Sequence, residues 1–385
     1  YREISKMQKA YKLHGVHRHY DWGGTQFIPH LMKVNNENNK PFAEYWMGAH
    51  PSAPAQIETN NGNVSIHEFG TLPYLFKVLD VAKMLSIQVH PTKENAEKGF
   101  LIEQTAGIPI DAPNRNYKDD NHKPEVMVAL SDFWLLHGFL APELLTARLQ
   151  EFTQFHSLQA LFKQDDYQGL YSHFMHLSTL ESDQILKPLL ADAIASVQKG
   201  KVDKSHPHWW ANKYYHGVVP EHNIDKGIFS IYILNIVQVK KYQGVFQGAG
   251  LLHAYLEGQN IELMANSDNV LRGGLTPKHI DIDELIKHVK FEPTYPAVLM
   301  GDPINEIETI YPCPVADFGL SKIVLNMGES YTINTQSLEM LLVMEGQVAL
   351  DGILYNPGEV ALVNPLQQLQ IQAKEASVLF KSFVP

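Results

Sequence analysis

The first residues that could do chemistry form a polar stripe in an otherwise apolar strand. The run from Leu85 to His90 alternates apolar and polar residues, which places Ser86, Gln88 and His90 on one strand face, and Pro91 ends the strand. A buried amide or imidazole without a partner costs roughly 1 to 3 kcal/mol. Nitrogen and oxygen atoms at positions i and i+2 can bind one metal ion, but an edge strand with its polar face in water has the same pattern. The stripe alone leaves both interpretations open.

A second cluster places an imidazole, an ammonium group and a carboxylate just before an apolar run. His122, Lys123 and Glu125 precede residues 126–130, which predict a strand. Clusters of this kind are commonly solvated loops. If Glu125 faces the same interior as His90, however, it supplies an anionic metal ligand, and Lys123 is near enough to donate to a substrate oxygen.

Two later segments carry further candidates. His253 lies in an apolar strand context, where a single histidine is commonly a core residue with hydrogen-bonded ring nitrogens. The polar segment 262–278 is typical of an ordered loop, and its Arg272 and Lys278 can bind an anion, although two surface cations would give the same pattern. Because the chain has a formal charge of −11, cations for a phosphate must be supplied locally. These residues indicate a β protein with a candidate metal site of mixed nitrogen and oxygen ligands.

Composition and missing motifs exclude several classes of protein. The single cysteine, Cys313, cannot form an intramolecular disulfide or a CxxC zinc site, which suits a reducing compartment. No apolar stretch reaches the roughly 20 residues of a membrane helix, and residues 1–6 lack the layout of a signal peptide. The acidic charge disfavours nucleic acid, and no GxGxxG, GxSxG, HExxH or phosphate-loop motif occurs. We expect a soluble, cytoplasmic protein with no membrane and no nucleic-acid partner.

The elements that must position these residues follow a β, α, β order. Short apolar runs and turn clusters such as residues 60–63 predict strands over roughly the first 140 residues, with little helical period. From Ala141 the apolar spacing predicts helices through Ile194, with Pro142 in a first turn. The helical pattern breaks around residues 206–210, and residues 228–234 predict the first strand of a second β-rich stretch.

The C-terminal part of the chain predicts a short helix and a small β unit. Residues 281–289 have acidic residues in a first turn and basic residues near the end, as a helix does. Apolar runs at 339–344 and 359–363, with glycine turns at Gly346 and Gly358, predict a sandwich or barrel. No histidine follows His288, so this unit cannot hold a histidine-based metal site.

Taken together, these segments resemble the type I mannose-6-phosphate isomerase family, whose motifs they match in order. The matches are Tyr20-Asp21-Trp22-Gly23-Gly24, Ala43-Glu44-Tyr45-Trp46-Met47-Gly48, Gln88-Val89-His90-Pro91, His122-Lys123-Pro124-Glu125, His253-Ala254-Tyr255, Asn266-Ser267-Asp268-Asn269, and Arg272 followed by Gly274-Leu275-Thr276-Pro277-Lys278. Each motif is short, but their shared order across residues 20–278 is specific.

The resemblance implies a mainly β fold, with a cupin-type jelly-roll barrel carrying an α-helical insertion and a second, metal-free cupin-like barrel after it. The expected ranges are 1–139 and 220–300 for the catalytic cupin domain, 140–219 for the insertion and 301–385 for the C-terminal barrel. It also implies one Zn²⁺ per chain, held by Gln88, His90, Glu125 and His253, which accounts for the glutamine in the polar stripe.

The activity that the resemblance implies is the interconversion of D-mannose 6-phosphate and D-fructose 6-phosphate through a zinc-stabilised enediol. Arg272 is the residue that the family marks as catalytic. The proton-transferring group is left open between Glu262, His122 and Lys123. Expected substrate contacts are Ser86 and Lys278 to the phosphate, and Tyr255 and Asp268 to hydroxyl groups.

Two other functions fit the same residues. An iron-dependent cupin oxygenase would keep the barrel and the ligands but use a different metal. A non-catalytic sugar-phosphate-binding cupin would keep the pocket without turnover. In each case the expected partner is a small-molecule sugar phosphate, and the chain is expected to be a monomer or a weak homo-oligomer.

Overall fold

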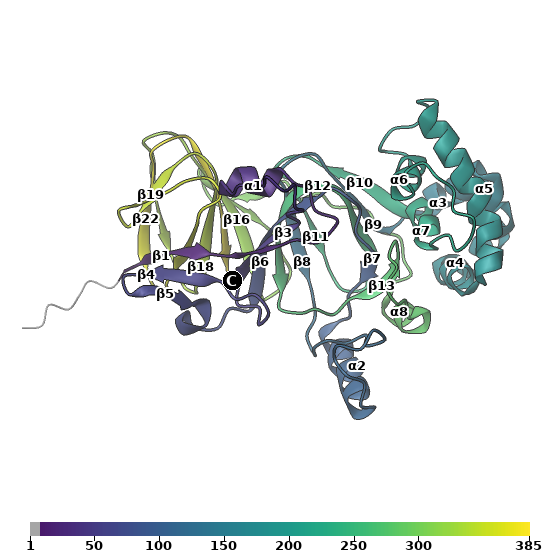
Figure 1. The fold of residues 1–385 in the computed structure, drawn as a ribbon, viewed down its shortest axis with the longest axis horizontal. Helices are drawn as coiled ribbons and strands as arrows, with labels where there is room; N and C mark the ends of the chain where they lie inside the picture. Colours follow the sequence, from purple (N-terminus) through teal and green to yellow (C-terminus); the bar gives the residue numbers. More distant parts are fainter. Residues whose placement is uncertain (1–7) are drawn as a thin grey trace, which may run out of the picture.

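The computed structural model describes residues 8–385, a mainly β protein whose three sheets and minority of helices lie along one long axis (Figure 1). The C-terminal strands lie at one end of this axis, most helices lie at the other, and the central sheet lies between them. Residues 1–6, on which the expectation about a signal peptide rests, lie outside the described part of the chain. None of the helices in residues 8–385 combines the length and the apolar character needed to cross a membrane.

The central sheet has ten strands, and its strand pairings are antiparallel. The strands are β2 (Val16–Arg18), β3 (Glu44–Gly48), β6 (Tyr74–Val81), β7 (Ile87–Val89), β8 (Glu125–Ala129), β9 (Phe133–Phe139), β10 (Leu234–Val239), β11 (Gly244–Gln247), β12 (His253–Ala265) and β13 (Leu271–Gly274). The long strand β12 pairs with β7 and β9 near its start and with β6 and β8 towards its end. This strand therefore links segments that are far apart in the sequence.

Apolar side chains from six strands of the central sheet meet in one buried cluster, so the sheet curves around them. The cluster contains Leu79 and Val81 of β6, Met127 and Ala129 of β8, Phe133 and Leu135 of β9, Val237 and Val239 of β10, Val245 of β11 and Tyr255 of β12. A curved sheet directs alternate residues of each strand into a common interior. Polar residues on the same strand faces are thereby brought together.

The polar stripe is centred on β7, an internal strand that contains Gln88, with Ser86 just before it and His90 just after it. Because β7 pairs with β12 on one side and β13 on the other, the edge-strand interpretation is wrong. Ile87 and Val89 are fully buried in the cluster that contains the helices. Gln88 and His90 consequently face the opposite side of the strand, towards the interior of the curved sheet.

Five helices cover the outer face of β7 and its neighbours (Figure 1). They are α3 (Pro142–Glu151), α4 (His156–His176), α5 (Thr179–Gln198), α6 (Pro207–Tyr214) and α7 (Gly227–Ile233), with a 3₁₀ turn (Thr153–Phe155) between α3 and α4. The predicted helix start at Pro142 is confirmed, because proline fits a first turn where its missing N–H is not needed. Ser178 and Glu181 form a capping box at the start of α5.

Three of the predictions about local structure are wrong. Residues 228–234, predicted as a strand, form α7 until Ile233. Residues 206–210, where the helical pattern is predicted to break, are the N-cap and the first four residues of α6. All seven residues of α7 are buried, so its sequence does not alternate between a buried and an exposed face. Such a sequence has no hydrophobic periodicity by which a buried helix could be told from a buried strand. Helix α2 (Lys93–Thr105) was missed because it is largely polar and buries few residues.

The remaining helices are short. They are α1 (Phe27–Met32), α8 (Ile282–His288) and a 3₁₀ turn (Ile66–Phe69). The prediction of a helix over 281–289 is confirmed, and the Asp281 side chain accepts a hydrogen bond from the Glu284 N–H at its start.

The C-terminal segment forms a nine-stranded and a four-stranded sheet around an apolar interior. The first contains β1 (Ala10–His14), β4 (Gln56–Thr59), β5 (Gly62–Ser65), β14 (Asp302–Pro303), β15 (Glu308–Tyr311), β16 (Gly319–Leu325), β18 (Glu339–Glu345), β21 (Val360–Val363) and β23 (Ser377–Phe383), and the second β17 (Ser330–Asn334), β19 (Val348–Leu350), β20 (Ile353–Tyr355) and β22 (Gln368–Ala373). The predicted strands at 339–344 and 359–363 are confirmed. N-terminal strands join this sheet, since Ala10 pairs with Val363.

Glu339, at the start of β18, makes the stability of the protein depend on pH. Its side chain is 5% exposed with one oxygen unpartnered, and burial raises its pKa from 4.5 to about 7. Between these values the unfolded chain has lost a proton that the folded chain keeps, so stability falls as pH rises. Glu339→Gln should therefore melt about 1 to 3 °C above wild type at pH 8 and level with it at pH 4.5.

Thermal unfolding followed by circular dichroism measures this difference at both pH values. Glu375→Gln, at an exposed position in the same segment, is the matched control, and its melting temperature should equal that of the wild type at both pH values. An equal gain for Glu339→Gln at pH 4.5 and pH 8 would contradict the explanation.

Candidate metal centre

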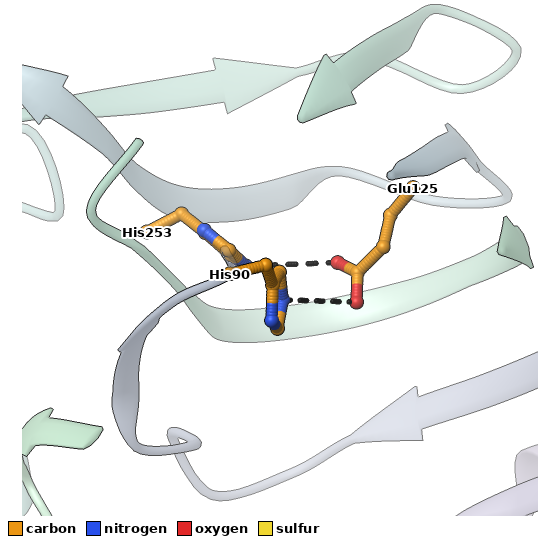
Figure 2. Close-up of side chains that lie close together, drawn as sticks. All are labelled: His90, Glu125 and His253. Atoms are coloured by element: carbon orange, nitrogen blue, oxygen red, sulfur yellow. Dashed lines mark ion pairs between the residues drawn. The ribbon is translucent and has the colours of Figure 1, made fainter. Parts of the chain in front are cut away.

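Three predicted ligands from distant parts of the chain converge inside the central sheet (Figure 2). His90 follows β7, Glu125 begins β8 and His253 begins β12. His90 Nε2 lies 3.3 Å from Glu125 Oε1, and His253 Nε2 lies 3.6 Å from Glu125 Oε2. The three side chains are buried, and each offers a ligand atom within 4.8 Å of the others. This separation suits ligands that share one ion.

Backbone carbonyl groups fix the orientation of both imidazole rings. His90 Nδ1 donates to the Asn269 carbonyl oxygen at 2.8 Å, and His253 Nδ1 donates to that of Leu251 at 2.8 Å. Since a carbonyl only accepts, each ring carries its proton on Nδ1 and directs a lone pair from Nε2. Both Nε2 atoms are buried and have no hydrogen-bond partner. The pair therefore fits a metal ion, which would satisfy both atoms.

The charge states of these groups also suit a metal. Burial lowers the pKa of His90 to about 4, so its imidazole is neutral at pH 7. Burial alone would raise the pKa of Glu125, but His90, His253 and Lys123 outweigh burial and hold this pKa well below its usual range. Neutral imidazole and ionised carboxylate are the forms that bind metals.

Gln88 lies beside these ligands through strand register. It is directly opposite His253 on β12 and directly opposite Arg272 on β13. Directly opposed residues of antiparallel strands project from the same face. His137 of β9 is opposite His253 on its other side, so one row across four strands contains His137, His253, Gln88 and Arg272. Sequence reasoning missed His137, because this row exists only in the register.

A buried acid–base network lies further along the same strands. Tyr255 donates its hydroxyl hydrogen to Glu262 Oε1 at 2.6 Å, and Lys77 Nζ lies 3.9 Å from Glu262 Oε2 and 3.4 Å from Glu44 Oε1. Burial, followed by the charge of Glu125, raises the pKa of Glu262 to about 7. Burial would lower the pKa of Lys77, but the surrounding carboxylates outweigh it and raise the pKa. The network therefore holds a carboxyl group that titrates near neutrality.

Sequence reasoning also missed Lys77 and used Glu44 only as part of a family motif. Lys77 interrupts the apolar residues of β6, which also contains Asp80, and charged residues in a strand that is buried along its whole length were a usable signal. Trp46 donates its indole N–H to Glu44 at 2.8 Å, so the Glu44 carboxylate is held in place beside Lys77.

The other two candidates for proton transfer have different neighbours. Lys123 Nζ lies 3.7 Å from Glu125 Oε1, beside the candidate ligands. His122 Nε2 lies 2.9 Å from Asp317 in the C-terminal segment. Its imidazole is therefore engaged by a carboxylate outside the metal cluster.

Arg272 and Lys278 form a local cationic site. Arg272 is half-buried, and within residues 8–385 its guanidinium has no ion pair or side-chain hydrogen bond. The charge of Arg272, together with burial, lowers the pKa of Lys278, so the two cations repel each other. Unpaired cations held together are typical of an anion site. Lys278 also lines a cavity of about 960 Å³ with Tyr20 and Trp22.

The last two predicted contacts are less enclosed. Ser86 is half-buried immediately before β7. Asp268 is half exposed, and its carboxylate pairs with His50 Nε2 at 2.9 Å. This pair lowers the pKa of Asp268, through the hydrogen bond from His50 above all.

Known proteins resemble this chain in both sequence and structure. A profile of the phosphomannose isomerase type I catalytic domain matches residues 10–141. The mannose-6-phosphate isomerase of Salmonella typhimurium is 38% identical over 371 residues, covering 90% of this chain and 92% of that protein. The mannose-6-phosphate isomerase of Escherichia coli is 36% identical over 385 residues, covering 94% and 95%. A crystal structure of the Salmonella typhimurium enzyme bound to its fructose 6-phosphate substrate and a zinc atom has a TM-score of 0.85 at 33% identity, covering 98% of this chain and 99% of that one.

Proposed function

This chain belongs to the type I phosphomannose isomerase family, and from that premise we propose how its residues carry out the reaction. It is a zinc-dependent enzyme that interconverts mannose 6-phosphate and fructose 6-phosphate. The relatives favour this activity over an iron oxygenase or a non-catalytic binding protein. The observation that carries it in this chain is the pair of buried, unpartnered Nε2 atoms that His90 and His253 direct at Glu125.

The proposed zinc ligands are Gln88, His90, Glu125 and His253. The register that puts Gln88 opposite His253 supports its amide oxygen as the fourth ligand. Three neutral ligands and one carboxylate leave a net positive charge on a divalent ion. Zinc held by these residues would polarise a substrate carbonyl group.

Arg272, Lys278 and Ser86 are proposed to bind and orient the substrate. Ser86 precedes β7 and Lys278 follows β13, the two strands that carry Gln88 and Arg272, and we assign the phosphate to them. Arg272 projects from the same sheet face as Gln88, so its guanidinium is placed to donate to the oxygen atoms where negative charge develops.

Glu262 is proposed as the proton-transferring group. The isomerisation removes a proton from the carbon beside the carbonyl and returns one to the neighbouring carbon, through an enediol. A carboxyl group with a pKa near 7 can do both at neutral pH. Tyr255 orients this carboxyl through its 2.6 Å hydrogen bond, and Lys77 supplies a nearby positive charge. The engagement of His122 by Asp317 and of Lys123 by Glu125 makes these two less suited to the role.

We also propose the domain assignment that the family implies. Residues 1–139 and 220–300 would form the catalytic cupin barrel, 140–219 the helical insertion and 301–385 a second cupin-like barrel. The C-terminal sheets pack around a cluster of apolar side chains and the segment contains no histidine, which supports a structural, metal-free unit. The N-terminal strands β1, β4 and β5 would be shared with it.

Arg272→Ala tests this function together with its cationic site. Zinc-loaded wild type should form fructose 6-phosphate from mannose 6-phosphate in a coupled assay, and Arg272→Ala should lose about 10²-fold in kcat/KM while keeping its zinc. Arg148→Ala, which removes a mostly buried guanidinium on α3, is the control and should keep wild-type kcat/KM. No turnover by the zinc-loaded wild type would remove the activity, and near wild-type kinetics of Arg272→Ala would remove this residue from the mechanism.

A further inference from the structure

The loop after Arg272 has an unusual backbone conformation, in which a glycine and the leucine after it both have positive φ. Gly274 has a φ of 128° and Leu275 a φ of 55°, and the latter is uncommon for a leucine. These two residues turn the chain between Arg272 on β13 and Lys278. A backbone held in such a conformation needs contacts from elsewhere in the protein.

Asp225, in the segment between α6 and α7, supplies those contacts. Its Oδ1 accepts hydrogen bonds from the Leu275 N–H at 2.8 Å and the Gly227 N–H at 2.7 Å, and its Oδ2 accepts from the Thr276 N–H at 2.9 Å. Tyr214 donates its hydroxyl hydrogen to Oδ2 at 3.4 Å. One carboxylate therefore joins the start of α7 to the loop that follows Arg272.

The two segments also meet backbone to backbone. A Cβ atom built on Gly274 would lie 2.5 Å from Gly227 Cα, and one built on Gly227 would lie 2.5 Å from the Leu275 nitrogen. Neither position has room for a side chain, so the start of α7 and the loop pack directly against each other, beside the Asp225 hydrogen bonds.

The helices are anchored to the central sheet at a second point, beside the cavity that Lys278 lines. Lys213, at the end of α6, donates to the Ala82 carbonyl oxygen at 3.1 Å and to Glu257 of β12 at 2.8 Å. Tyr214 and Tyr215 line the 960 Å³ cavity together with Lys278. The end of α6 therefore forms part of the wall of this cavity, and Asp225, in the segment that follows it, holds the loop that lines the same cavity.

We propose that Asp225 is a positioning residue, through which the segment between α6 and α7 holds the Arg272 to Lys278 loop in the conformation that binds the substrate phosphate. This rests on the proposed roles of Arg272 and Lys278. It gives the segment between α6 and α7 a direct part in substrate binding, although none of its residues needs to touch the reacting carbon atoms.

Asp225→Ala and Asp225→Asn test the proposal, with Asp183→Ala as the matched control. Asp183 on α5 accepts from the Asn223 N–H at 3.0 Å and the Ile224 N–H at 2.9 Å, so it holds the same segment without a bond to the loop. Asp225→Ala should raise the KM for mannose 6-phosphate about 10- to 100-fold, with a smaller loss in kcat and unchanged zinc content. Asp225→Asn, which keeps one acceptor oxygen, should be intermediate.

Inhibition by inorganic phosphate gives a second measure that a general loss of stability would not change. Its inhibition constant should rise in Asp225→Ala and stay near wild type in Asp183→Ala. Equal KM values for the two alanine variants would overturn the proposal. If Asp225→Ala does not fold, the KM values of Asp225→Asn and Asp183→Asn are compared instead, and equal values would again overturn it.

Lys278→Ala separates this proposal from the function on which it rests. A raised KM in Lys278→Ala with wild-type kinetics in Asp225→Ala removes only the positioning role. An unchanged KM in Lys278→Ala contradicts the assignment of the phosphate itself.

Discussion

His253→Ala is expected to lose bound zinc and at least about 10³-fold in isomerase activity. The ion supplies several kcal/mol of stabilisation to charge that develops on the substrate oxygens, and each 1.36 kcal/mol is a factor of ten. Without His253, Glu125 and His90 keep their places but one of the two unpartnered Nε2 atoms is gone. Metal analysis after dialysis and the coupled assay measure both losses.

His137→Gln is the control for this variant. His137 is a buried histidine in the same cross-strand row, directly opposite His253, but it lies outside the proposed ligand set. The His137→Gln variant should keep one zinc per chain. Removal of zinc from the wild type with a chelator should reproduce the kinetics of His253→Ala. Full zinc content and activity in His253→Ala would refute the proposed centre.

Glu262→Gln should lower kcat by about 10³-fold, because the amide cannot accept the proton that isomerisation moves. Its zinc content should not change, since Glu262 is not a proposed ligand. Glu257→Gln is the matched control: it lies on the same strand, pairs with Lys204 and Lys213, and should keep wild-type kcat. A Glu262→Gln enzyme with full activity would return the role to His122 or Lys123.

The pH dependence of kcat/KM tests the assignment of Glu262, because the direction of its change can be predicted. The carboxyl must be ionised to accept a proton, so activity should fall as pH drops through its pKa, which lies near 7 without metal and lower when a cation is bound nearby. The positive charge of Lys77 lowers this pKa, so Lys77→Met should move the acid limb of kcat/KM to higher pH. A shift to lower pH would mean that another group titrates.

Local patterns predicted much of what is local in this protein. Period two placed Gln88 and His90 on one face of β7, and Pro142 marked the start of α3. The same reasoning failed for α7, because a fully buried run carries no period, and for α2, because a mostly polar helix carries too few apolar residues. Both predictions failed because neither sequence shows a clear contrast between an apolar, buried face and a polar, solvent-exposed face.

By itself the sequence determined the ligand types, their order along the chain and the family they indicate. Only the tertiary structure decided that β7 is internal, that His137 and Arg272 stand in one row with Gln88, and that Asp225 reaches the loop after Arg272. The physical reason is that both kinds of neighbour depend on the path of the whole chain. The register between strands sets which residues stand opposite each other, and the chain path sets which backbone N–H groups a distant carboxylate can reach. Residue type and spacing describe a segment, whereas which segments become neighbours is settled when the whole sheet curves around its core.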